Sequence, residues 1–282
     1  MENEKGLITI AIGKKYVTQA KYLAWSCILN SPQMLRAVVT DCPKLLEPYF
    51  DIIIPFNRDF EDPFSVKTRL NLYTPFQKTL FLDADSLVMS NLDVYWESLK
   101  NCNIAYEGNM ISEGEWYVDI KSLCKKLKVA AISKFNSGMI LFNKSKEVNK
   151  VFDDAYYYFV NHKKEGIEIP YFRGTMYPDE PCFAIAYAKN KISPTNDFGR
   201  FSRTLINASE ININVLKGFA VFKKNGRAVF PLVVHFCGKF GNIFYRREKA
   251  RLYFCFNPPF KALFSYLAVS LRKTLRKKKI NN

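Results

Sequence analysis

The chain has 282 residues, of which 48% are hydrophobic and 15% aromatic, and its formal net charge is +16. A chain of this length and composition can bury a large core, so we expect one globular domain with appendages. Its seven cysteines are an odd number with no Cys-x-x-Cys pair, which argues against a disulfide framework or a zinc knuckle and favours a reducing compartment.

The positive charge is unevenly distributed along the chain. Residues 249–282 contain nine basic and no acidic side chains, so more than half of the net charge of +16 lies in this C-terminal tail. The charged N-terminal residues lack the apolar core of a secretory signal, and no apolar run approaches the ~20 residues that a transmembrane helix needs. We therefore expect a cytoplasmic protein that does not span a membrane.

The N-terminal region alternates between predicted strands and a predicted helix. Residues 7–12 form a short apolar run closed by Gly13, and residues 16–29 carry apolar side chains at helical spacing. Residues 37–39 and 51–55 are typical of two further short strands. This alternation predicts an α/β fold with a mostly parallel sheet. Such sheets bind ligands at the carboxyl ends of their strands, which is where Gly13 falls.

A basic segment precedes the next predicted strand. Residues 66–73 are expected to form a helix, with Lys67 and Arg69 offset from its apolar face. Either base could reach a phosphate. The equal alternative is that both belong to a solvated cationic face.

Two carboxylates separated by one residue interrupt the apolar run that follows. Asp83 and Asp85 come directly after residues 79–82, and a strand or a turn there would bring their charges together. A divalent cation relieves their repulsion and leaves coordination sites for the oxygens of a diphosphate. The alternative is that the acids simply open a turn. Their position within an apolar run favours the metal interpretation.

Polar segments also occur in the middle of the chain. Residues 107–119 are polar and carry aromatic side chains, as is typical of substrate loops. Asn136 and Ser137 come before Gly138, which permits close backbone approach, and a predicted buried strand. The two polar side chains could hydrogen-bond a sugar, although an ordinary turn is the commoner use of such a segment.

Acidic and imidazole side chains complete the set of candidate site residues. Asp179 and Glu180 precede a predicted helix, where they either cap it or accept hydrogen bonds from sugar hydroxyls. His235 lies in an apolar run and is either a satisfied core residue or a third metal ligand. His162 lies among lysines, and we expect it to be exposed.

The C-terminal tail combines apolar and basic residues. Phenylalanines and leucines recur at helical spacing over residues 260–275, and the chain then runs Arg-Lys-Lys-Lys. At about 1 kcal/mol per basic residue, such a helix would bind an anionic membrane surface. An arm for nucleic acid would not need the phenylalanines, so we expect no nucleic-acid partner. The alternative is a helix packed on the body of the protein.

Taken in order, these motifs resemble those of the retaining, metal-dependent GT-A glycosyltransferases of the glycogenin and bacterial lipooligosaccharide galactosyltransferase type, which are glycosyltransferase family 8-like. The resemblance extends from Ile8 to about Lys239. It departs from the family where Lys239 directly follows Gly238 and where Glu180 replaces a glutamine. The motifs that carry it are a base-binding turn at residues 12–16, a basic helix at 67–70, a metal motif at 82–88, a sugar-contact strand at 135–139, an acidic pair at 179–180 and a closing motif at 235–238.

The resemblance implies a domain division and a role for each matching residue. Residues 1–248 would form a single GT-A (Rossmann-like) nucleotide-diphosphosugar transferase domain with a mostly parallel mixed sheet. Residues 249–282 lie beyond the resemblance, and their own pattern predicts a basic amphipathic helical tail. Tyr16 would stack on uracil and Arg69 would lie near the phosphates. The implied ligands of Mn²⁺ or Mg²⁺ are Asp83, Asp85 and His235, and the implied catalytic residues are Asp179, Glu180 and Asn136. The implied nucleotide-sugar contacts are Ile12, Gly13, Tyr16, Arg69, Asp83, Ala84, Asp85, Asn136, Ser137, Gly238 and Lys239.

These observations together favour an enzyme. We expect a peripheral membrane glycosyltransferase that moves a hexose, glucose or galactose, from a UDP-sugar to a glycan or glycolipid acceptor, with retention implied by the resemblance. One alternative is a sugar nucleotidyltransferase. Such an enzyme holds a triphosphate with a glycine-rich loop after the first strand, and residues 13–15 are too poor in glycine to form one. The other is a non-catalytic basic protein that binds nucleic acid or a membrane, which leaves the acidic pair unexplained.

Overall fold

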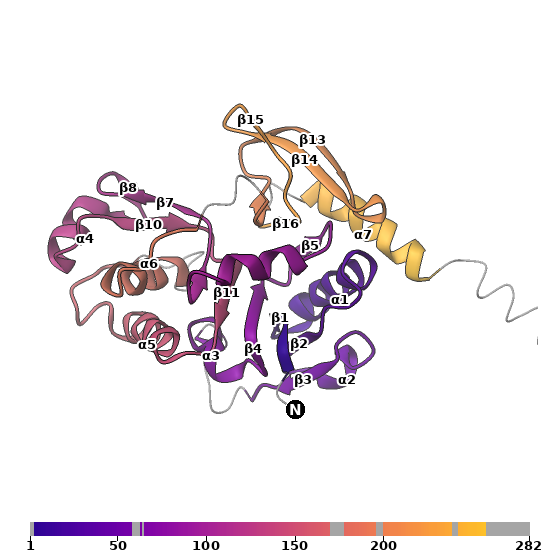
Figure 1. Cartoon of the computed structure of the whole chain (residues 1–282), viewed down its shortest axis with the longest axis horizontal. Helices are drawn as coiled ribbons and strands as arrows, with labels where there is room; N and C mark the ends of the chain where they lie inside the picture. Colours follow the sequence, from indigo (N-terminus) through magenta and orange to yellow (C-terminus); the bar gives the residue numbers. More distant parts are fainter. Residues whose placement is uncertain are drawn as a thin grey trace, which may run out of the picture.

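A six-stranded sheet runs through the centre of the computed structural model, which describes residues 3–57, 63, 65–169, 178–195, 200–238 and 242–257 (Figure 1). Its strand order is β3-β2-β1-β4-β11-β6. The first four strands are parallel, whereas β11 runs antiparallel to both β4 and β6. This confirms the predicted mixed, mostly parallel sheet. The strands are β1 (Asn3–Ala11), β2 (Arg36–Thr40), β3 (Ile52–Pro55), β4 (Phe76–Leu82), β6 (Ile104–Ala105) and β11 (Met139–Asn143).

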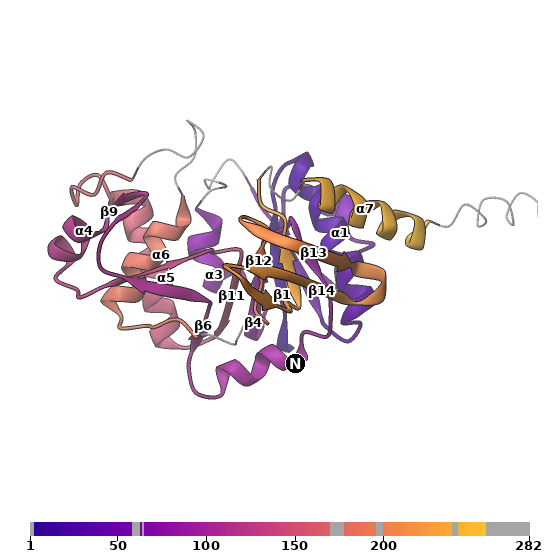
Figure 2. The same ribbon diagram turned by 90° about the horizontal axis from the view of Figure 1, so that it is seen from above.

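Side chains alternate across this sheet, so it has a separate core on each face. Phe81 of β4 packs with residues of α5 (Lys146–Asn161) and α6 (Asp179–Lys189). Its neighbours Leu80 and Leu82 pack on the other side with residues of α1 (Lys14–Asn30) and of η2 (Asp93–Leu99). Figure 2 shows the sheet between these helices. Asp83 continues β4 in register with Phe81, which directs it toward the α5 and α6 side.

Smaller sheets lie beyond the carboxyl ends of the central strands. One consists of β12 (Arg203–Thr204), β16 (Val233–His235) and β5 (Ser86–Val88), and another of β13 (Ala208–Asn214), β14 (Phe219–Lys224) and β15 (Arg227–Val229). Two strand pairs are β7 (Gly108–Ile111) with β10 (Ile132–Phe135) and β8 (Glu115–Trp116) with β9 (Val118–Asp119). The other helices are α2 (Pro43–Leu46), η1 (Val66–Arg69), α3 (Leu70–Tyr73), α4 (Ile120–Leu127), η3 (Val215–Lys217) and α7 (Asn242–Phe256).

Helix α7 is attached to the body by a buried carboxylate and an aromatic stack. Glu248 is fully buried, accepts the backbone N–H of Val215 at 2.9 Å and pairs with Arg251 at 2.7 Å. Near the end of the helix, Phe256 stacks on Trp25 of α1 with ring centroids 5.0 Å apart. The expected boundary after residue 248 falls inside α7, and residues 258–282 lie outside the described part, so the two-domain division stays a prediction. No helix among the described residues is long and apolar enough to cross a bilayer.

The expectation for His162 was wrong. The residue follows α5 directly, and its side chain is only 2% exposed. Its Nδ1 lies 3.2 Å from the carbonyl oxygens of Tyr158 and Phe159, the last turn of the helix. The neighbouring lysines point to solvent while the imidazole packs inward, a difference that composition alone does not predict.

Candidate active site

The acidic pair lies in a tight turn between β4 and β5. The backbone N–H of Asp83 donates to the carbonyl of Gly138 at 3.0 Å, and the N–H of Ser86 donates to the carbonyl of Asp83 at 3.0 Å. The turn therefore connects two strands that both belong to the core, with Ala84 buried between the acids. Each carboxylate is about one quarter exposed, at 29% for Asp83 and 24% for Asp85. The acids are held by the backbone and still open to a ligand.

His235 reaches the acidic pair because β16 pairs antiparallel with β5. In that register His235 lies directly opposite Ser86, the residue after Asp85. Its Nε2 lies 3.0 Å from Asp85 Oδ1 and 3.6 Å from Asp83 Oδ2. One ligand atom from each of the three residues lies within 4.8 Å of the others. The structure thus brings together the three residues that the sequence analysis suggests as metal ligands.

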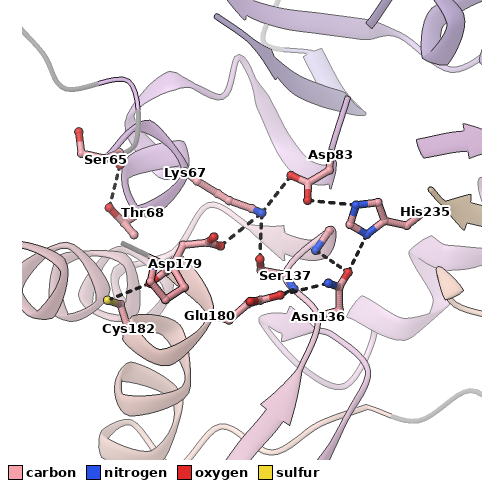
Figure 3. A network of polar contacts seen from close by, with 12 residues as sticks. Ser65, Lys67, Thr68, Asp83, Asn136, Ser137, Asp179, Glu180, Cys182 and His235 are labelled. Atoms are coloured by element: carbon pink, nitrogen blue, oxygen red, sulfur yellow. Dashed lines mark hydrogen bonds and ion pairs between the residues drawn. The ribbon is translucent and has the colours of Figure 1, made fainter. Parts of the chain in front are cut away.

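The imidazole of His235 is oriented by Asn136. The amide nitrogen of Asn136 donates to Glu180 Oε1 at 3.1 Å, which leaves Asn136 Oδ1 facing the ring at 2.7 Å from His235 Nδ1 (Figure 3). The N–H of Gly138 donates to the same oxygen at 3.2 Å. Because that oxygen can only accept, Nδ1 carries a proton, and Nε2 is therefore the ring nitrogen that can give up its proton and bind a cation. This is how a metal-ligating histidine is usually held.

Gly138 is required for this contact. A Cβ atom there would lie 2.3 Å from His235 Nδ1 and 2.7 Å from Asn136 Oδ1, well inside van der Waals contact. The sequence-based expectation of a close backbone approach at Gly138 is therefore confirmed. Any larger residue would displace the ring.

Lys67 contributes a buried cation to the site. Its Nζ lies 2.9 Å from Asp83 Oδ1, 2.9 Å from Ser137 Oγ and 3.3 Å from Asp179 Oδ2 (Figure 3). Burial alone would lower the pKa of Lys67, but the carboxylates of Asp179 and Asp83 outweigh burial and raise it above the ordinary value for lysine. Lys67 is therefore charged at neutral pH.

The opposite wall of the site is the first turn of α6. This helix has Pro178 at its N-cap and no side-chain capping bond, so neither acid of the first turn caps the helix. Asp179 pairs with Lys67, whereas Glu180 accepts from Asn136 and from the hydroxyl of Tyr117. Burial and the charge of Asp179 raise the pKa of Glu180 above its usual range.

The carboxylates of the acidic pair have unequal acidities. Burial raises the pKa of Asp83, against the opposing effect of Lys67. Burial also disfavours ionised Asp85, but the adjacent His235 lowers its pKa below the ordinary value. Burial lowers the pKa of His235, but Asp85 and Asp83 together raise it by more, so the pKa lies above the ordinary value for histidine. A divalent cation bound by two carboxylates and the free imidazole nitrogen would compensate these costs, and this donor set suits Mn²⁺ or Mg²⁺.

The remaining predicted residues lie at the end of β1 or outside this network. The N–H of Gly13, which has a φ of 93°, donates to Asp41 Oδ1 at 2.9 Å, and the nearby Tyr16 is 41% exposed. Ile12 is buried, Gly238 is exposed with a φ of 62°, and Lys239 lies outside the described residues. Arg69 places its guanidinium over the ring of Tyr156, 5.0 Å from the centroid. The structure therefore puts Lys67, and not Arg69, among the carboxylates.

Tyr117 belongs to the site although the sequence analysis assigned it no role. Its hydroxyl contacts Glu180 closely, and its backbone has a φ of 61°, in the left-handed region that non-glycine residues rarely adopt. The polar, aromatic character of residues 107–119 pointed to this loop but to no residue within it.

Comparisons with known proteins identify the fold. No family model matches the sequence, and no curated protein matches it. Among solved structures, an active-site mutant of LgtC has a TM-score of 0.59 and 16% sequence identity, covering 87% of this chain and 95% of the other. The galactosyltransferase LgtC in complex with donor and acceptor sugar analogues has a TM-score of 0.55 and 17% identity, covering 83% and 87%. The bifunctional glycosyltransferase WbbM gives 0.51 and 13%, covering 85% and 46%. The chain therefore has the GT-A fold of these glycosyltransferases, as predicted.

Proposed function

We propose that this protein is a metal-dependent glycosyltransferase that moves a hexose, glucose or galactose, from a UDP-sugar to a glycan or glycolipid acceptor. The observation that carries the proposal is the convergence of Asp83, Asp85 and His235 Nε2 in one place, with Asn136 orienting the imidazole. This set lies at the carboxyl end of β4, where sheets of this kind bind their ligands. The resemblance to glycosyltransferases in fold agrees with it.

The chemistry follows from where charge develops. Breaking a sugar–phosphate bond leaves negative charge on the diphosphate and an oxocarbenium-like sugar ring. The three ligands would hold Mn²⁺ or Mg²⁺, which supplies Lewis-acid stabilisation of the leaving diphosphate. Lys67 adds a second positive charge beside Asp83, and because it is held by three partners it needs no reorganisation during the reaction.

The acids of α6 would face the sugar. Asp179 and Glu180 lie across Lys67 and Asn136 from Asp83 and His235 (Figure 3), so they can accept hydrogen bonds from donor hydroxyls and favour positive charge on the ring. One of the solved neighbours is a mutant of LgtC in which an active-site glutamine is replaced by glutamate. The family pattern likewise has glutamine where this chain has Glu180. We take retention of configuration and the stacking of Tyr16 on uracil from the same resemblance.

We further propose that the protein is cytoplasmic and binds to a membrane surface. Residues 258–282 carry the basic and apolar pattern that suggests it, and they lie outside the described part of the chain. Helix α7, which leads into them, exposes the large apolar side chains Ile243 and Phe254 at 75% and 62%. Removing residues 260–282 should reduce binding to anionic vesicles while sparing turnover in solution.

The central test uses Asp83→Ala. UDP release from UDP-glucose and UDP-galactose is measured with Mn²⁺, with excess chelator, and with the exposed Asp93→Ala as a matched control that removes one carboxylate elsewhere. We expect Asp83→Ala to lower the rate at least about 100-fold, the scale of losing a group that stabilises transition-state charge. Full activity in chelator would refute the metal assignment, and release of no UDP from either donor would refute the proposed transfer of glucose or galactose.

A further inference from the structure

A cavity of about 730 Å³ adjoins the candidate active site. Asn136, which orients His235, forms part of its wall. Arg203 of β12 lines it as well, and in the pairing of β12 with β16 this residue lies opposite Val234, next to His235. A molecule in the cavity would therefore sit beside the groups that hold the metal and the donor.

The cavity is positively charged. The basic side chains that line it are Lys134, Arg203, Lys224 and Arg227, and the acidic residue among the described lining residues is Glu107. Glu107 forms an ion pair with Arg203, and both side chains are mostly buried, at 20% and 16% exposure. Three lysine and arginine charges remain without a carboxylate among the described lining residues.

The β14–β15 hairpin places two of these basic residues opposite each other. Its turn residues, Asn225 and Gly226, have φ values of 49° and 77°, as a two-residue type I′ turn requires. This turn fixes Lys224 directly opposite Arg227 across the two strands. Like charges in that position are destabilising unless an anion lies between or beside them. An anion bound beside the hairpin would therefore favour both charges.

Lys224 is additionally fixed in place. Its Nζ donates to the carbonyls of Thr204 at 3.1 Å and Ile206 at 2.6 Å, which draws the amine toward β12 and Arg203. Burial, followed by the charge of Arg203, lowers the pKa of Lys224 below the ordinary value. An anion in the cavity would reverse the second effect.

We propose that this cavity binds the acceptor, and that the acceptor is an anionic sugar carrying a phosphate or carboxylate group. The inference rests on the proposed function, since an acceptor site presupposes glycosyl transfer. The shared chemistry of the ligand is an oxyanion on a sugar ring, bound by lysine and arginine at the hairpin while its nucleophilic hydroxyl faces Asn136. A neutral glycan would leave these cations uncompensated.

Three probes with one ring and different charge test the idea: glucose, glucuronate and glucose 6-phosphate. Their dissociation constants for the full chain are measured by ligand-observed NMR at low ionic strength, with and without UDP and Mn²⁺. We expect at least one anion to bind about tenfold more tightly than glucose, a difference that high salt reduces. Preference for glucuronate or for glucose 6-phosphate identifies the oxyanion as carboxylate or phosphate.

Variants that remove individual charges test whether the anion binds in this cavity or to the positively charged surface in general. Arg227→Gln should weaken anion binding about threefold and the double variant Lys134→Gln/Arg227→Gln about tenfold, with glucose unaffected. Lys223→Gln is the matched control: it removes one positive charge next to Lys224, on the opposite face of β14, where the side chain pairs with Glu210. Equal effects of Arg227→Gln and Lys223→Gln would overturn the proposal.

The same measurements test the acceptor assignment and the glycosyltransferase proposal separately. If UDP binds with Mn²⁺ but glucose binds as tightly as both anions, the acceptor assignment fails and the glycosyltransferase proposal stands. If UDP does not bind with Mn²⁺, the proposed function fails and the acceptor assignment fails with it.

Discussion

Replacing Gly138 by alanine tests whether backbone contact positions the metal ligand. The new Cβ would lie 2.3 Å from His235 Nδ1, so the imidazole must move away by about 1 Å to reach ordinary contact. That movement breaks the 2.7 Å hydrogen bond to Asn136. Losing such an orienting partner typically costs about 10–100-fold in metal affinity, and overpacking costs about 1–3 kcal/mol of stability.

The assay is titration of Mn²⁺ by electron paramagnetic resonance, which needs no turnover, together with the thermal midpoint. Gly6→Ala is the control, because a Cβ there would lie 2.4 Å from ring carbons of the buried Phe76, at the opposite end of the sheet from the site. We expect both variants to lose stability and Gly138→Ala alone to lose Mn²⁺ affinity. Unchanged affinity in Gly138→Ala, or an equal loss in Gly6→Ala, would refute the reasoning.

Two further predictions concern the charges of the site. Lys67→Gln removes the cation shared by Asp83 and Asp179 and should cost about 3 kcal/mol of stability, because it takes the nearest positive charge from two mostly buried carboxylates. Added Mn²⁺ should therefore raise the melting temperature of this variant more than that of the wild type, and equal increments would contradict the shared role. At pH values above neutral, Glu180→Gln should raise the melting temperature by about 2 °C or more, because burial and Asp179 disfavour the ionised form of Glu180. Since its pKa is raised by folding, the destabilising effect of Glu180 disappears as pH falls through that pKa, and the advantage of the variant should disappear with it. Melting curves across the acidic to neutral range check this, and an advantage that grows at low pH would contradict it.

Much of the fold and part of the site follow from local sequence patterns. The strand before Asp83 and the acids after it are adjacent in the chain, so a periodic apolar run followed by charge predicts both their structure and their position. Gly138 was recognised for the same reason, as a glycine immediately before a buried strand. Arrangements of this kind need no knowledge of the tertiary structure.

The choice between Lys67 and Arg69 could not be made in that way. Side chains two residues apart on a helix point in different directions. Because η1 is a 3₁₀ helix, the angle between them differs from that in an α-helix. Packing against α5 then decides which base faces the carboxylates and which lies over Tyr156. Tyr117 escaped prediction because its position depends on a left-handed backbone conformation that sequence alone does not indicate.

The pairing of β16 with β5 makes the third ligand a product of strand register. His235 is separated from Asp85 by about 150 residues of chain, yet its place is set by the backbone pairing of β16, which puts it opposite Ser86 of β5 and Thr204 of β12. A slip of one residue would turn the imidazole to the other face while leaving both strands intact. Insertions in the connections before β16 can therefore be absorbed, whereas a single deletion within its three residues would uncouple metal binding from an otherwise folded protein.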